Sequence, residues 1–302
     1  MDWRSAHREA MVIAFEAHED LAIDTFARID VFDAMAASGL RLVFRDLQDS
    51  AALYLPAHLG GTPGAIIKAQ HPLALQRYSG AHEYGHHLFG HGEQIDRNSE
   101  PRGTGAALAP AEKLAEAFAS WFLMPPEAVD AVLERIGITD IARPHDAYAL
   151  ALRLGTSFSA TCTHLPSLKL VPGGTAEQWR ALALKGIKQE LTTSPPPGGW
   201  KNDVWVLGPE DASVELVVRA GDRLLLDLPA WDIDHAPHQA TVTRIEPTDL
   251  LSSPRWQVDL PPDMPPGPTR LSLRDPSTTV TFTLCVEQPR RGRYVRTIAL
   301  AR

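Results

Sequence analysis

The segment YSGAHEYGHHLFGHG, residues 78–92, carries two histidines four positions apart and a glutamate directly after the first of them. Each residue of an α-helix turns the chain by about 100°, so His82 and His86 lie on one face, where two imidazoles can hold one metal ion. Glu83 lies about a quarter turn away, where its carboxylate can reach a water molecule at that ion. The pattern His-Glu-x-x-His is the minimal arrangement of a zinc hydrolase, with two ligands and a general base.

Accidental spacing in an ordinary core helix is the alternative, because the pattern fixes only three positions. The neighbouring residues favour the metal site. Gly85 and Gly90 give the helix a small side that can pack closely against another element, and such glycines are typical neighbours of these sites. We therefore predict one zinc ion held by His82 and His86, with Glu83 as the general base.

A catalytic zinc needs a third protein ligand and one open position. The best source is AEKLAEAFASWFLMP, residues 111–125, which is apolar almost all round beyond its first turn, as expected of a buried helix. Glu112 and Glu116 share one face of this helix, and a buried carboxylate without a partner is costly. One of them could bind zinc while the other accepts the free N–H of a ligand histidine. Alternatively, Glu112 lies in the exposed first turn, favoured there by the helix dipole, and Glu116 alone faces the ion. The spacing does not decide between the two.

The rest of the N-terminal part predicts helices around a small sheet. RLVFRDL (41–47) and GAIIKA (64–69) are typical of short strands. GAIIKA is either an edge strand, along which a peptide could lie extended, or an interior strand. Residues 91–110, polar and rich in Gly and Pro, predict a mobile loop. Amphipathic patterns and stop signals predict helices at 3–18, 25–38, 76–90, 110–124, 126–136, 144–155, 157–165 and 175–191.

The character of the sequence changes at TTSPPPGGW, residues 192–200, where prolines and glycines predict a linker. Beyond it, short β-branched runs with period 2, from VWVLG to YVRTIAL (294–300), are separated by Pro and Gly turns. This spacing predicts an all-β sandwich of about 100 residues. We therefore expect an α+β protein with a mainly helical domain over 1–191, a linker over 192–200 and a β-sandwich over 201–302.

The formal net charge of −8 disfavours a general surface for nucleic acids or anionic membranes, because such surfaces need excess Lys and Arg. The sequence has neither the pattern of a signal peptide nor an apolar run of about 18 residues. The distant Cys162 and Cys285 do not predict a structural disulfide. We expect a cytoplasmic protein without membrane partners.

Residues 146–170, read as a helix, a glycine turn and a second helix, could form a helix-turn-helix. The segment carries few basic residues, Arg153 and Lys169. A role in packing is therefore expected rather than direct binding of DNA.

The segments QRYSGAHEYGHHLFGH and EKLAEAFASWFLMP together resemble the ImmA/IrrE-like family of zinc metallopeptidases, over roughly residues 25–170. Members carry R-x-x-x-A-H-E-x-G-H-x-x-x-x-H and then E-x-x-A-N-x-F-A-x-x-L-L-M-P. The resemblance implies a zincin-like metallopeptidase domain in which Glu112 is the third zinc ligand. Glu116 stands where the family usually has Asn or Asp, a residue that orients a ligand histidine. Because Glu116 is a longer carboxylate, it is also an alternative ligand.

The resemblance further implies a zinc-dependent endopeptidase in which Glu83 deprotonates the attacking water. Members typically cleave a helix-turn-helix repressor of the same cell in response to DNA damage or other stress, so a repressor is the expected substrate. A second donor to the oxyanion is also expected. The candidates are Tyr54, Tyr78, Tyr84 and His91, and the sequence assigns none of them.

Two other functions compete with this prediction. In the first, zinc only holds the helices together in a non-proteolytic regulatory or partner-binding module, and the intact Glu83 argues against it. In the second, the protein is a DNA-binding regulator that uses residues 146–170, and the acidic balance argues against it. The β-sandwich, which the catalytic motifs do not need, is expected to bind the substrate or a sensor partner.

Overall fold

The protein is described here by a computed structural model that covers residues 1–48, 50–57, 61–92, 94–96, 108–228, 231–245 and 256–287. Among these residues, one compact unit holds Met1–Val132 and Leu154–Arg180, and a second holds Leu133–Arg153 and the chain from Ala181 onward. Helices precede a C-terminal set of strands, which confirms the α+β class. The expected division at 192–200 stays a prediction, because helices before this segment already belong to the compact unit of the strands.

The first unit contains a four-stranded sheet with the order β1-β3-β2-β4. The strand β3 pairs with β1 in parallel and with β2 antiparallel. GAIIKA is therefore an interior strand, and the alternative that it forms an edge is wrong. The strands β2 and β4 were not predicted, since both are too short to show a clear period-2 pattern. The elements of this unit are α1 (Trp3–Asp20), α2 (Val31–Ala37), β1 (Arg41–Arg45), β2 (Ala52–Leu55), β3 (Gly64–Lys68), α3 (Leu73–Leu88), β4 (Gln94–Asp96), α4 (Pro110–Leu123), most of α5 (Pro126–Arg135), α7 (Phe158–His164) and α8 (Gly173–Arg180).

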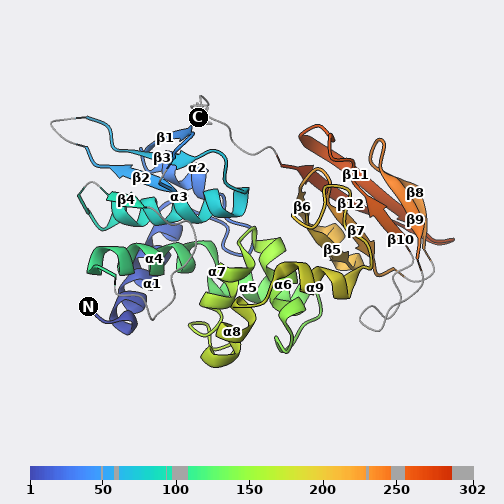
Figure 1. Ribbon diagram of the computed structural model, residues 1–302, viewed down its shortest axis with the longest axis horizontal. Helices are drawn as coiled ribbons and strands as arrows, with labels where there is room; N and C mark the ends of the chain where they lie inside the picture. The colour runs from blue at the N-terminus through green and yellow to red at the C-terminus, as the bar shows by residue number, and fades with distance from the viewer. Residues whose placement is uncertain are drawn as a thin grey trace. The chain divides into compact units, whose positions relative to one another are not determined.

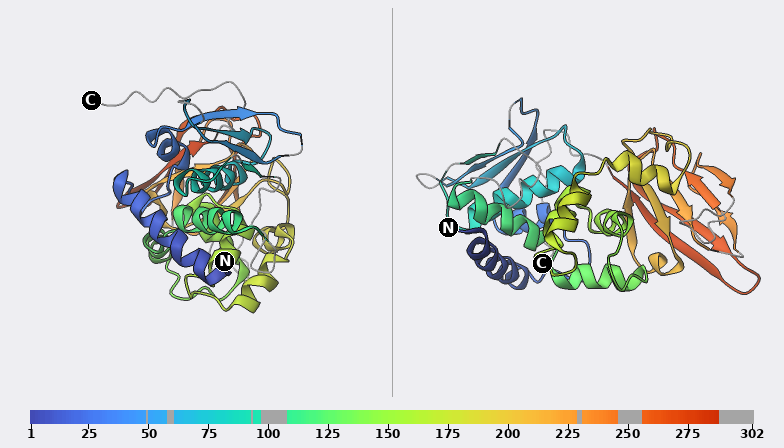
Figure 2. Two further views of the ribbon diagram at one scale, coloured as in Figure 1. Left: turned by 90° about the vertical axis from the view of Figure 1, so that its left-hand side faces the viewer. Right: turned by 60° about the horizontal axis from the view of Figure 1, so that its bottom comes forward.

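The helix α3 lies between the small sheet and α4, and α1 packs against the other side of α4 (Figures 1 and 2). Every residue of α3 from Gln76 to His86 is buried, and so is every residue of α4 from Leu114 to Leu123. An α-helix that is enclosed on all sides loses its amphipathic pattern. The central position of α3 therefore explains why polar side chains such as His82 and Glu83 are buried.

The helix expected at 25–38 is shorter than predicted and begins only at Val31. Asp30 is the N-cap of this helix, because its side chain accepts hydrogen bonds from the backbone N–H groups of Phe32 and Asp33. Such an N-cap stabilises a helix start by about 1 kcal/mol. The helix ends before Gly39, as predicted, and Gly39 has a φ of +83°.

Gly85 allows a close approach between α3 and α4. A Cβ added at Gly85 would lie 3.1 Å from Ala115 Cα and 3.1 Å from Phe118 Cδ1. We expect Gly85→Ala to lower the free energy of unfolding by about 1–3 kcal/mol, because the added methyl overpacks this interface. Zinc affinity should fall too, since α4 also carries Glu112. Chemical denaturation and zinc titration check this, with Gly92→Ala as the control, because a Cβ there meets nothing within 4 Å. Unchanged stability and zinc affinity in Gly85→Ala would contradict the close approach.

The second unit contains two four-stranded sheets that lie face to face (Figure 2). Their strand orders are β5-β7-β10-β9 and β6-β12-β11-β8. One hydrophobic cluster, which includes Leu224 of the first sheet and Phe282 of the second, fills the space between them. The expected β-sandwich is thus present. Its elements are β5 (Val204–Leu207), the short helix η1 (Pro209–Ser213), β6 (Glu215–Val218), β7 (Arg223–Leu226), β8 (Asp232–His235), β9 (Thr241–Arg244), β10 (Trp256–Asp259), β11 (Gly267–Arg274) and β12 (Thr279–Val286).

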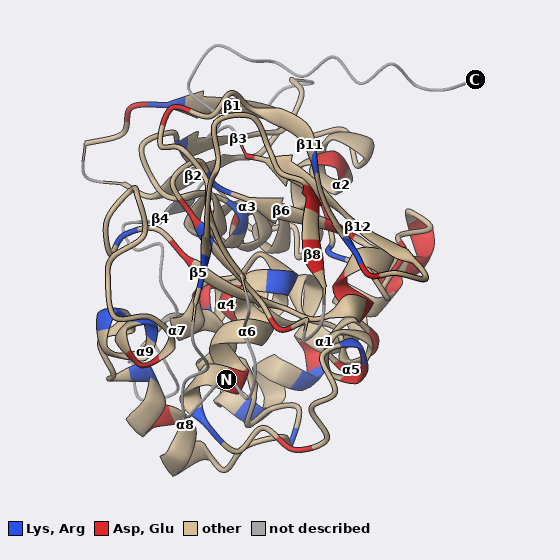
Figure 3. Ribbon diagram, turned by 90° about the vertical axis from the view of Figure 1, so that its right-hand side faces the viewer, with Lys and Arg blue, Asp and Glu red and all other residues tan. Residues whose placement is uncertain are grey.

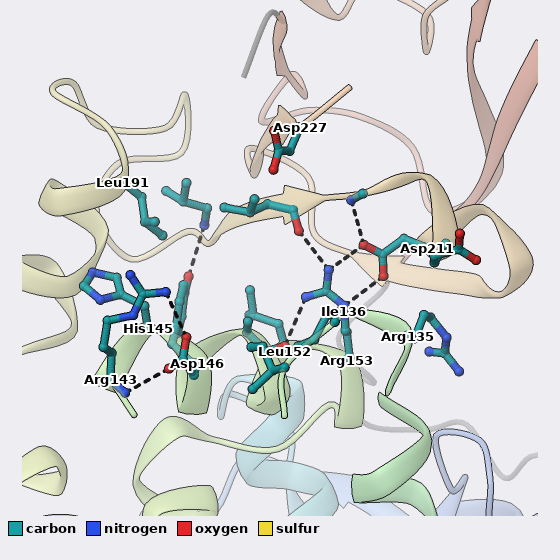
Figure 4. A pocket seen from close by; sticks show the side chains of 18 of the residues that line it. Arg135, Ile136, Arg143, His145, Asp146, Leu152, Arg153, Leu191, Asp211 and Asp227 are labelled. Carbon is teal, nitrogen blue, oxygen red and sulfur yellow. Dashed lines mark hydrogen bonds and ion pairs between the residues drawn. The ribbon is translucent and has the colours of Figure 1, made fainter. Parts of the chain in front are cut away.

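Two helices of the second unit, α6 (Pro144–Leu154) and α9 (Leu184–Leu191), are joined to the strands by buried polar groups. Arg153 of α6 donates from Nε to Asp211 Oδ1 at 2.8 Å and from Nη2 to the carbonyl oxygen of Val206 (Figure 4). Lys188 of α9 pairs with Asp203 Oδ1 at 2.9 Å. These charges are satisfied only while the strands are in place.

The single helix expected at 175–191 is two helices, α8 and α9, which belong to different compact units. Trp179 of α8 and Ile187 of α9 are both buried, and each is buried within its own unit. Residues 181–183, between the two helices, include neither Gly nor Pro. The helix is therefore interrupted because its two halves pack into different hydrophobic cores. Propensity alone does not reveal such a break.

None of the described helices combines the length and the apolar character that a membrane crossing needs. The strand expected at 294–300 lies outside the described residues. So does most of the loop expected at 91–110, although residues 94–96 of that segment form β4.

Candidate metal centre

The helices α3 and α4 bring three candidate ligands together. Nε2 of His82 and Nε2 of His86 lie 3.0 Å apart. Glu112, in the first turn of α4, places Oε2 at 3.5 Å from His82 Nε2 and Oε1 at 3.5 Å from His86 Nε2. One ligand atom from each residue lies within 4.8 Å of the others, in the only group of this kind found in the described part of the chain.

Burial makes these side chains suitable for a metal ion. The side chains of His82 and His86 are 4 % and 0 % exposed, and that of Glu112 is 20 % exposed. Burial, together with the nearby imidazoles of His82 and His91, lowers the pKa of His86 to about 2. A neutral imidazole offers a lone pair, and two imidazole nitrogens with one carboxylate oxygen are a donor set that zinc takes in hydrolases. The three residues therefore fit a zinc ion.

His91 contacts the other nitrogen of a candidate ligand. Its Nδ1 lies 2.8 Å from Nδ1 of His86, so one ring donates to the other. A His86 that binds metal through Nε2 must carry its proton on Nδ1, and His91 then accepts it. Such a partner fixes the tautomer and the orientation of a ligand histidine.

Gly90 positions His91. After α3 ends, Gly90 adopts a φ of +65°, and the backbone N–H of His91 donates to the carbonyl oxygen of His86 at 2.9 Å. The chain thus turns back over the last turn of the helix, as is common where glycine follows a helix. In the sequence, His91 was only one of several candidate oxyanion donors. Two features of the sequence could have predicted this position: Gly90 directly before His91, and the spacing of five residues between His86 and His91.

The three candidate tyrosines have other partners. Tyr54 OH lies 3.1 Å from Nδ1 of His87, and Tyr84 OH lies 2.6 Å from Oγ of Ser38. Tyr78 OH donates to the backbone oxygen of Glu116 at 3.3 Å. In this arrangement each hydroxyl helps to hold the helices, and the second oxyanion donor stays unassigned.

Glu83 and Glu116 are both buried, at 0 % and 8 % exposure. Glu83 follows His82 directly on α3. Glu116 lies one turn beyond Glu112 on α4 and does not belong to the group of three candidate ligands. The geometry thus favours Glu112 over Glu116 as the ligand, and the roles of Glu83 and Glu116 stay predictions.

Comparison with known proteins agrees with this geometry. Residues 35–165 match the model of a protein family described as IrrE N-terminal-like domain, Peptidase_M78. The matched residues include both α3 and α4 and therefore the three candidate ligands His82, His86 and Glu112. No curated protein matches the chain.

Proposed function

We propose, from the match of residues 35–165 to this peptidase family, that the protein is a zinc-dependent endopeptidase of the ImmA/IrrE-like family. The observation that carries the proposal is the meeting of His82, His86 and Glu112 within 4.8 Å. A site with three protein ligands keeps one position open for chemistry, whereas a purely structural zinc site is closed by four. The buried Glu83 supplies a carboxylate next to a ligand, which a structural site does not need.

In this proposal, His82 and His86 hold zinc through their Nε2 atoms and Glu112 holds it through its carboxylate. Zinc, when bound, supplies Lewis acidity, which lowers the pKa of water towards about 7 and polarises a carbonyl group. Glu83 accepts a proton from the attacking water and later delivers it to the leaving amine nitrogen. Its burial strengthens the electrostatic interactions of its carboxylate. His91 keeps the Nδ1 proton of His86 in place, so that Nε2 stays free for the metal.

The substrate peptide is proposed to lie extended along β4. With GAIIKA in the interior, β4 is the strand at the edge of the sheet next to β2, and it contacts α3. An extended peptide can add to a sheet edge through backbone hydrogen bonds. In this proposal β4, and not GAIIKA, is the edge strand along which the peptide lies.

We propose a helix-turn-helix repressor of the same cell as the substrate, with limited cleavage in a stress or DNA-damage response. The support is the resemblance of the two motifs to enzymes that act in this way. The competing DNA-binding function is disfavoured, because Arg153, one of the few basic residues of 146–170, is buried in a pair with Asp211. A phosphate contact needs an accessible cation.

Zinc content tests the ligand assignment. We expect about one zinc per wild-type chain, measured by elemental analysis, because the three ligands form one site. Glu112→Gln should weaken zinc binding by more than about 100-fold, because it removes a charged ligand, and Glu116→Gln by no more than the roughly 10–100-fold typical of an outer residue. Both substitutions keep the side-chain shape, and circular dichroism controls for folding. Loss of zinc mainly in Glu116→Gln would reassign the third ligand, and absence of zinc from the wild type would refute the metal site.

Cleavage tests the activity. The full chain is co-expressed with a helix-turn-helix repressor encoded by a neighbouring gene, and the repressor is followed by immunoblotting and mass spectrometry. A defined internal cut that depends on zinc supports the proposal. Zinc bound at one per chain without cleavage of any candidate repressor would favour the non-proteolytic module.

A further inference from the structure

The helix α1 exposes a group of large apolar side chains. Met11, Val12 and Phe15 are 42 %, 47 % and 54 % exposed, which makes them three of the eight large hydrophobic residues exposed in the described part of the chain. They lie within an arc of about 100° on one face of α1. Single exposed apolar residues are ordinary, but a contiguous group marks an interaction surface.

A cavity of about 470 Å³ lies beside these side chains. We call it the α1 groove; it is lined by Met11, Val12 and Phe15 on α1 and by Trp121, Pro125 and Pro126 at the end of α4 and the start of α5. Its lining residues on α1 run from Met11 to Glu19, or about 12 Å along the helix axis. The groove is thus long enough to bind two or three apolar side chains from one helical face.

The border of the α1 groove is acidic. Glu16, Glu19 and Glu127 line it, and no Lys or Arg is among the described residues that do so. His18, which also lines the groove, is buried; its Nε2 donates to the carbonyl oxygen of Phe122 at 3.0 Å, and burial lowers its pKa. Acidic residues on α1 and α5 are drawn red in Figure 3. A ligand of this groove must therefore combine apolar and cationic groups.

We propose that the α1 groove binds an amphipathic helix of a protein partner, with apolar anchors flanked by Lys or Arg. An apolar helical face laid into a hydrophobic groove is a common mode of peptide recognition. Complementary charges at the border speed association and select the partner. A second copy of this chain fits poorly, because a symmetric contact would bring Glu16, Glu19 and Glu127 close to the same residues of the other copy.

The groove is separate from the metal centre. The helix α1 packs against one side of α4 and α3 against another. The zinc candidates come from α3 and the first turn of α4, whereas the groove uses Trp121 near the end of α4. The proposal therefore does not depend on zinc or on peptidase activity, and groove variants should keep their zinc content.

The test is a selection from a displayed library of 15-residue amphipathic helices in which the flanking positions are Lys, Arg, Glu or Asp. Immobilised wild-type chain should enrich Lys and Arg flanks over Glu and Asp flanks by about 10-fold or more, and the double variant Glu16→Lys, Glu19→Lys should reverse this preference. Phe15→Ser should weaken binding of the enriched peptides by about 10-fold or more, as expected of a central aromatic anchor. The matched control is Phe26→Ser, because Phe26 is 63 % exposed and does not line the groove.

Three outcomes would overturn the proposal. The first is no enrichment, or equal enrichment of basic and acidic flanks. The second is a wild-type dimer that Phe15→Ser dissociates in sedimentation experiments, which would assign the groove to a second copy. The third is a gain in peptide affinity after removal of residues 289–302, which contain five arginines and would then be the occupant.

Discussion

Glu83→Gln is expected to lower kcat/KM for cleavage of the repressor by about 10²–10⁴-fold, the usual contribution of a general base. Glutamine keeps the shape of the buried side chain but cannot accept the proton of the attacking water. The zinc content should stay near one per chain, because His82, His86 and Glu112 are unchanged. The measurement is a time course of repressor cleavage by purified full-length protein, with zinc determined in the same samples.

A matched control separates this effect from a general loss of charge. Glu177→Gln changes an exposed glutamate of α8 and should cleave at the wild-type rate. If Glu83→Gln cleaves within about twofold of wild type, Glu83 is not the general base. If Glu83→Gln loses zinc together with activity, the role of Glu83 is to support the metal site.

The histidine pair was predictable because its geometry is local. The periodicity of a helix alone brings His82 and His86 to one face, whatever surrounds them. The third ligand was harder to predict, because the spacing on the helix fits Glu112 and Glu116 equally well. The structure separates these two glutamates by one turn of α4, and Glu112 in the first turn lies 3.5 Å from both imidazoles. That choice depends on how α4 crosses α3, which the close approach at Gly85 determines.

Non-local pairing explains the features that the sequence did not reveal. GAIIKA is interior because Ala52–Leu55 pairs with its second edge, and this four-residue strand has too little periodicity to be recognised. His91 reaches His86 because Gly90 adopts a positive φ, so its position depends on one backbone angle. Local patterns predict elements, whereas strand order and backbone turns between elements depend on the whole fold.

Contacts between distant residues also determine which helices belong to the second unit. Arg153 and its partner Asp211 are 58 residues apart, and Tyr148 bonds to Asp203 across 55 residues. From the sequence, Arg153 was only one of the few basic residues of a possible DNA-binding segment. In the structure, the side chain of Arg153 is 3 % exposed and that of Asp211 is 2 % exposed. The helix α6 therefore depends on the strands that follow the proline-rich segment.

Asp211→Asn is expected to destabilise the second unit by about 3–5 kcal/mol, the usual cost of removing one partner from a buried ion pair. The substitution leaves the Arg153 guanidinium buried without a countercharge, although its bond to the Val206 carbonyl oxygen remains. Thermal unfolding should shift downward by roughly 6–20 °C. Differential scanning calorimetry measures the shift, and the double variant Arg153→Met, Asp211→Leu should recover much of the loss, because it removes both charges together.

The control for this prediction is an exposed pair in the same unit. Arg274 and Asp234 lie 3.5 Å apart with side chains that are 66 % and 39 % exposed, so Asp234→Asn should cost no more than about 1 kcal/mol. Equal costs for Asp211→Asn and Asp234→Asn would contradict the buried pair. If the prediction holds, deleting residues 201–302 would also remove Asp203 and Asp211, the partners of Lys188 and Arg153. Such a truncation would then unfold α6 and α9, and loss of cleavage in it would report on folding rather than on recognition by the strands.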